Sequence, residues 1–258
     1  MTGTPITPSK ALSRLLCGAS SADANSKLFP NLVLRASVGR ALFAISHWKY
    51  SNYASNDGLA IATYARRLLE GSTTALLLRV DPLRVLALGE LQRSGSYQLN
   101  QRNLLTMQWT GDVFAKEKSE FKDCNPDKLD RSLFSNLCST VIWKPALEGL
   151  QTHLSEEGQS SEWKIEILQK EPDNFAREIV GQLNSSFSYF SKGIHNEWVV
   201  RRRSHMGNND VRSNVSSVIK NITMCAAVLS FSPFVRQFNN QKSLIKLIDT
   251  IESEFGVI

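Results

Sequence analysis

The stretch PDNFAREIVGQLNSSFSYFSKGI, residues 172–194, decides the fold class of this chain. Pro172 and Asp173 are residue types that open helices, and the apolar pattern breaks at Gly193, a residue type favoured at helix ends. Between these points the apolar residues recur at intervals of three and four, the period of one helix face. They are Phe175, Ile179, Leu183, Phe187 and Phe190. The stretch therefore predicts an amphipathic helix over 174–191 that is interrupted at Gly193.

The same period extends through most of the chain on both sides of this stretch. No period of 20 to 50 residues repeats, which argues against a solenoid. The sequence thus predicts an all-α protein, an irregular helical bundle of roughly seven to nine helices. We expect an N-terminal helical part, 1–121, and a C-terminal helical part, 130–258, with one continuous domain as the alternative. The further predicted helices cover residues 8–16, 31–48, 57–80, 82–93, 98–121, 130–154, 211–232 and 244–255.

Two places in this helical pattern are irregular. Pro145 lies inside the predicted helix 130–154, and proline removes a backbone donor, so we expect a kink there. Residues 163–168 alternate apolar and polar side chains, which is the one respectable strand signal in the chain. A single strand leaves its backbone groups unpaired. A helix and an extended arm are therefore equal alternatives for 163–168.

Composition narrows the protein class. The 258 residues are 42% hydrophobic and 21% charged, which supports a folded core and argues against global disorder. The net charge of +6 favours phosphates or acidic partners. Neither a signal peptide nor a run of about 18 apolar residues occurs, which predicts a cytoplasmic protein without membrane contact. The four cysteines form no CxxC pair, which favours core thiols over a zinc site or a disulfide framework.

Several known enzyme signatures are absent from the sequence. It contains no GxxxxGK[ST] loop, no GxGxxG after a strand, no HExxH and no GxSxG. No two of the four histidines have the spacing of metal ligands on one helix. We expect no cofactor and no metal, and the balance leans away from an enzyme.

Polar chemistry is densest immediately after Gly193. His195 and Glu197 follow it, and a carboxylate beside an imidazole can raise the pKa of the ring and orient its proton. The pair is therefore a candidate for acid or base catalysis. The alternative is that both side chains cap the junction between two core helices.

A basic segment continues from this point. Arg201, Arg202 and Arg203 are candidates for binding nucleic-acid phosphates together with Lys192, and Trp198 and His205 are candidates for stacking on unpaired bases. The alternative is a solvated basic turn that pairs with acidic residues of a neighbouring subunit.

The order of a long helix, Ser191-Lys192-Gly193-Ile194-His195 and a second long helix resembles HEPN-like helical proteins of bacterial defence and toxin systems, over about the last third of the chain. Catalytic HEPN ribonucleases have an arginine separated from a histidine by four to six residues. Arg201 and His205 have three residues between them and do not fit, whereas Arg40 and His47 have six and do. The residue after Arg40 is apolar, which departs from the family pattern.

The resemblance implies a metal-independent mechanism in which the histidine acts on a ribose 2′-hydroxyl and the arginine holds the phosphate, in a dimer. Three functions follow as hypotheses. The leading one is a helical component of a bacterial antiphage defence or toxin-like assembly that binds a protein partner, or a second copy, and also nucleic acid, through its basic C-terminal third. The others are a HEPN-type ribonuclease and a purely structural subunit or inhibitor.

Overall fold

The computed structural model describes residues 7–18, 29–50, 58–93, 133–157, 161–194, 208–235 and 240–255. Throughout these ranges the regular secondary structure is helical, which confirms the prediction of an all-α protein. The helices α5 and α6 are joined by a π-helical turn, Ser139–Trp143, into one continuous helix. Counted in this way the described residues form nine helices, within the predicted seven to nine. Their bounds are α1 (Pro8–Cys17), α2 (Phe29–Tyr50), α3 (Gly58–Val80), α4 (Pro82–Arg93), α5 (Asn136–Cys138), α6 (Lys144–Glu157), α7 (Glu162–Gln169), α8 (Phe175–Ile194), α9 (Asn208–Leu229) and α10 (Gln241–Phe255).

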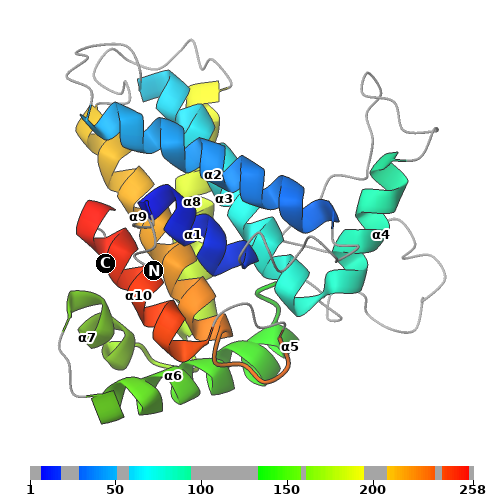
Figure 1. Cartoon of the computed structure of the whole chain (residues 1–258), viewed down its shortest axis with the longest axis vertical. Helices are drawn as coiled ribbons and strands as arrows, with labels where there is room; N and C mark the ends of the chain where they lie inside the picture. Colours follow the sequence, from blue (N-terminus) through cyan, green and yellow to red (C-terminus); the bar gives the residue numbers. More distant parts are fainter. Residues whose placement is uncertain are drawn as a thin grey trace, which may run out of the picture.

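The helices from the two halves of the sequence pack on one another. Consecutive α2 and α3 lie against each other, α3 also contacts α8 and α9, and α1 packs on α2 and α10. Figure 1 shows α2 crossing the front of the bundle, α6 and α7 at its lower end, and α4 extending away from it. Buried side chains of all these parts form one hydrophobic cluster. Helices before residue 94 and after residue 132 therefore share a core.

The helix α8 follows the predicted pattern. Phe175, Ile179, Leu183 and Phe190 are buried on its inner side. The helix continues through Gly193 to Ile194, the last described residue of this range, so the predicted interruption at Gly193 is wrong. Glycine lowers helix propensity by about 1 kcal/mol but does not forbid a helical backbone, and here it occupies the last turn. The loss of apolar periodicity marks the end of the buried face.

Residues 163–168 belong to the helix α7, so the extended alternative for this segment is wrong. Trp163 and Ile167 are buried, and their spacing of four is a helical one. The Trp163 Nε1 donates a hydrogen bond of 3.2 Å to Oδ1 of Asp249 in α10. A helix satisfies the backbone groups that an isolated strand leaves unpaired.

The irregularity near Pro145 is a π-helical turn that immediately precedes it. The Lys144 N–H donates to the Ser139 carbonyl five residues back. This wider turn fits a proline that lacks an N–H and crowds the preceding turn in regular α geometry. Trp143 of the same turn is fully buried and donates a 2.8 Å hydrogen bond to the Leu133 carbonyl. The turn therefore anchors the start of α6 in the core.

A buried arginine ties α3 to α9. Arg79 is 1% exposed, and its guanidinium donates to the Ala226 carbonyl at 3.3 Å and to Ser230 Oγ at 3.1 Å. Burial lowers the pKa of Arg79 to about 10, and the neighbouring Cys17 opposes this shift. The side chain thus stays protonated at neutral pH and binds the carboxyl end of α9, where helix carbonyls lack intrahelical partners.

The remaining expectations concern one predicted helix, the cysteines and membrane contact. The predicted helix 98–121 lies wholly outside them. Cys17 and Cys225 are buried free thiols, as expected for core cysteines. Within the described ranges, no helix combines the length and apolar content needed to cross a membrane.

Candidate functional site

Most of the predicted site after Gly193 lies outside the described residues. This applies to His195, Glu197, Trp198, Arg201, Arg202, Arg203 and His205. Lys192 is described and is exposed in the last turn of α8. The site hypotheses built on the other seven side chains therefore stay predictions.

The ends of four helices lie together at one end of the bundle. Figure 1 shows the last residues of α2 and α8 and the first residues of α3 and α9 at its upper end. Arg66 of α3 connects two of these helices there, because its Cζ lies 4.7 Å from the centre of the Phe187 ring in α8. Lys192 and His47, from the two predicted sites, thus belong to helix ends at the same end of the molecule.

The second predicted pair lies wholly within α2. Arg40 and His47 are both exposed and are seven residues apart, so they project from the same side of the helix. The axial distance between them is about 10 Å at 1.5 Å per residue. Phe43 lies between them, and its ring is nearly parallel to that of His47, with centroids 6.3 Å apart and an interplanar angle of 11°. Arg40, Phe43 and His47 therefore form a continuous polar and aromatic surface.

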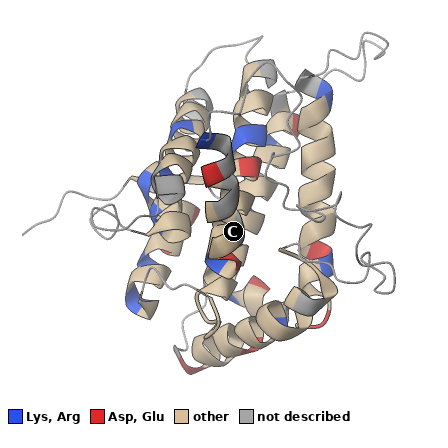
Figure 2. Ribbon diagram, turned by 90° about the vertical axis from the view of Figure 1, so that its right-hand side faces the viewer, with Lys and Arg blue, Asp and Glu red and all other residues tan. Residues whose placement is uncertain are grey.

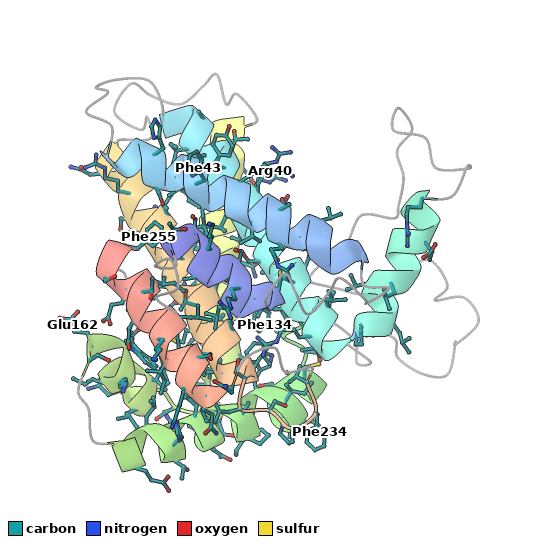
Figure 3. The ribbon with its side chains drawn as sticks, viewed as in Figure 1. Arg40, Phe43, Phe134, Glu162, Phe234 and Phe255 are labelled. Atoms are coloured by element: carbon teal, nitrogen blue, oxygen red, sulfur yellow. The ribbon has the colours of Figure 1, made fainter. Side chains whose placement is uncertain are left out.

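The surface continues toward the start of α2. Val33 is 48% exposed and Phe43 is 68% exposed, and Ala36 is also exposed. We define the outer face of α2 as Val33, Ala36, Arg40, Phe43 and His47. These positions follow intervals of three and four over about 21 Å of helix. Figure 3 shows Arg40 and Phe43 on α2, far from Glu162 and Phe234 at the lower end of the bundle.

The opposite side of α2 explains why its outer face points to solvent. Val38, Ala41, Leu42 and Ile45 are buried there. The helix packs closely on α3, because a Cβ added to Gly71 would lie 3.4 Å from Val38 Cγ2. Arg35 Nη2 also donates a 2.9 Å hydrogen bond to the Cys17 carbonyl at the end of α1. These contacts fix the rotation of α2 about its axis.

The net positive charge of the chain comes from residues 1–93. Residues 1–93 contain 11 Lys and Arg and 5 Asp and Glu, whereas residues 94–258 contain 19 of each. The whole net charge of +6 therefore comes from residues 1–93, and α1 and α2 contain no carboxylate. Figure 2 shows that lysines and arginines are spread over several helices, so the excess is not one compact patch. The outer face of α2 thus lies on an acid-free helix.

Sequence reasoning identified Arg40 and His47 but missed Val33, Ala36 and Phe43. The predicted helix 31–48 was recognised from the opposite stripe that includes Val38, Leu42 and Ile45. The signal for the outer face was nevertheless present, because its five positions have the same helical period. When a helix has two stripes with helical spacing, only one of them can pack in the core, and the other stays exposed to solvent.

Other groups with chemical potential do not form a site in the described part of the chain. No three or more His, Cys, Asp or Glu side chains gather there in a way that could hold a metal ion. Glu252 has a raised pKa because of partial burial first and the neighbouring Asp249 second. These carboxylates lie beside Trp163, whose backbone N–H donates to Glu252 and whose indole donates to Asp249. Their role is to join α7 to α10.

No family model, curated protein or solved structure matches this chain. The site must therefore be interpreted from its own residues.

Proposed function

We propose that this chain is a helical subunit of a bacterial antiphage defence or toxin-like assembly, and that it binds a protein partner through the outer face of α2. The class of assembly is proposed from the resemblance of the C-terminal third to HEPN-like proteins. The observation that carries the partner binding is the 68% exposure of Phe43 in a helical stripe that also exposes Val33. Single exposed apolar residues are ordinary on protein surfaces. Aromatic and aliphatic side chains aligned at helical spacing, with an arginine among them, have the composition of an interface centre.

The assembly itself provides the test. The chain is expressed with a tag in its native cells, and the lysate is fractionated by size. We expect the wild-type chain to elute in a particle larger than the 28.8 kDa monomer. Phe43→Glu should elute as a monomer, since a carboxylate in a desolvated interface is costly.

Ser188→Glu is the matched control, because Ser188 is an exposed residue on the outer side of α8. It should leave the particle intact. A wild-type chain that elutes as a monomer contradicts the proposal. So does a Phe43→Glu chain that stays in the particle.

Nucleic acid is a second proposed ligand, bound by Lys192, Arg201, Arg202 and Arg203. The support is the run of three arginines with Trp198 and His205 on either side of it in the sequence. Log affinity falls as log salt concentration rises. Replacing the three arginines by glutamine should make this dependence shallower by about 2 to 3, since each phosphate contact contributes about 0.7 to 0.9 to the magnitude of the slope. An unchanged slope contradicts phosphate binding by these arginines.

One observation favours a ribonuclease as the alternative function. Arg40 and His47 have the spacing of the HEPN motif and are exposed on one side of α2. In this alternative His47 exchanges a proton with a ribose 2′-hydroxyl and Arg40 holds the phosphate. His47→Ala and His195→Ala, tested singly for RNA cleavage, decide it. Undiminished cleavage by both variants excludes both histidines as the base.

A further inference from the structure

The outer face of α2 also specifies the chemistry of what covers it, and this inference rests on the proposed function. Its positions, Val33, Ala36, Arg40, Phe43 and His47, follow intervals of three, four, three and four. This is the spacing of the a and d positions of a heptad, with which one helix packs along another. The face therefore fits a second helix that runs along about four turns of α2.

The charges of the face restrict the second helix further. Arg40 lies between apolar positions, so a helix packed over them removes its guanidinium from water. A cation buried in this way requires a paired carboxylate. Among the described residues Arg40 forms no ion pair, whereas Arg66 of α3 binds Glu70 at 3.0 Å. Since no described carboxylate pairs with Arg40, we infer that the occupant supplies the acidic group.

A second copy of this chain does not supply that group from the same helix. The 22 residues of α2 include no Asp or Glu. Two copies packed through their outer faces would place Arg40 opposite a carboxylate-free helix in every register. The excess of cations in residues 1–93 adds to the repulsion between such copies.

We propose that the occupant of the outer face of α2 is an amphipathic helix of a different protein. It carries apolar side chains at heptad spacing against Val33, Ala36 and Phe43. It also carries a carboxylate opposite Arg40. The aromatic pair of Phe43 and His47 forms the widest apolar contact, and the ion pair at Arg40 sets the register and the choice of partner.

The probe is a synthetic helical peptide of about three heptads, with leucine at a and d and glutamate at the flanking positions. A matched peptide has lysine in place of every glutamate. Binding to the purified full chain is measured by fluorescence anisotropy. We expect the glutamate peptide to bind at least about tenfold more tightly than the lysine peptide, in line with a charge pair in a desolvated interface.

Arg40→Glu should reverse this preference, and Phe43→Ser should weaken the binding of both peptides. Arg177→Glu makes the same charge change at an exposed position of α8 and should leave the preference as it is in the wild type. Circular dichroism verifies that each variant is folded. A reversed preference in Arg40→Glu combined with an unchanged one in Arg177→Glu supports the inference.

Three results of the peptide experiment overturn it: no binding of the glutamate peptide, equal binding of the two peptides, or the same change of peptide preference in Arg177→Glu as in Arg40→Glu. A wild-type dimer in sedimentation that Phe43→Glu dissociates also overturns it, because the occupant is then a second copy. The proposed function fails separately, when Phe43→Glu leaves the native particle unchanged. If Phe43→Glu abolishes the particle but the glutamate peptide does not bind, only the inference of an acidic helical partner fails, and the proposed function stands.

Discussion

The two long helices α2 and α8 bury one face each, and they differ in what remains outside. The exposed residues of α8 are glycine or polar, and the polar ones include Arg177, Gln182, Ser185, Ser188 and Lys192. The exposed side of α2 includes Val33 and Phe43 at 48% and 68% exposure. A polar outer face is complete once the helix is folded, whereas an apolar one gains free energy from a further contact. The comparison is the basis for the proposal that α2, unlike α8, forms an interface in addition to its part in the fold.

The largest expected effect tests the inner faces of both helices. Phe190→Ala in α8 should reduce the free energy of unfolding by about 3 to 5 kcal/mol, and Leu42→Ala in α2 by about 2 to 5 kcal/mol. Both side chains are fully buried. Urea denaturation monitored by circular dichroism measures the change. A loss below about 1 kcal/mol at either position contradicts the core assigned to that helix.

A smaller loss should follow from removing the buried charge that anchors α3, the helix on which α2 packs. Arg79→Met keeps most of the volume but removes both donors to the end of α9. The Ala226 carbonyl keeps the hydrogen bond of 2.8 Å from Ser230 Oγ. We therefore expect a decrease of about 1 to 3 kcal/mol in the free energy of unfolding, the net contribution of the two hydrogen bonds that are lost. Met also ends the cost of burying a cation, so an increase in stability would show that desolvation outweighs the two hydrogen bonds.

Changing the outer face of α2 to resemble that of α8 should separate binding from stability. The double variant Val33→Gln/Phe43→Gln replaces exposed apolar groups by polar ones. The free energy of unfolding should stay within about 0.5 kcal/mol of the wild type for each substitution, as for other surface positions. The particle in native cells should nevertheless be lost. A large loss of stability would mean that these side chains belong to the core.

The smallest effect concerns pH at the contact between α7 and α10. The pKa of Glu252 is raised in the folded state, so its protonated form is favoured there. The contribution of Glu252 to stability is fully present below its pKa in the unfolded chain, and it is lost as the pH rises through its higher pKa in the folded protein. Glu252→Gln should therefore raise the free energy of unfolding at pH 7 by less than about 0.5 kcal/mol and leave it unchanged at pH 3. Thermal denaturation at both pH values checks the sign.

The helical class and the position of α8 follow from sequence because Phe175, Ile179, Leu183 and Phe190 make a regular stripe. Such a stripe depends on neighbours three and four residues away, which the chain itself supplies. The helix α7 could not be distinguished from a strand because its four apolar residues within 163–168 fit both periods. The contact of Trp163 with Asp249 of α10 decides it, and that contact joins residues 86 positions apart.

The candidate site was less predictable. Arg40 and His47 were found through a motif, but the motif does not reveal that Phe43 and Val33 stay exposed beside them. That depends on which of two helical stripes of α2 meets α3, as at Val38 and Gly71. Arg79 lies in the last turn of α3, where charged residues are common, and its burial depends on a contact with Ala226 of α9, 147 residues later.

Photocrosslinking from position 43 in native cells tests the central claim most directly. A photoreactive phenylalanine analogue replaces Phe43 in one chain and Ser188 in another, and crosslinked products are identified by mass spectrometry. The outer face of α2 is a protein interface if position 43 forms a discrete adduct with another protein and position 188 forms none. Equal labelling from the two positions, or no adduct from position 43, would contradict it.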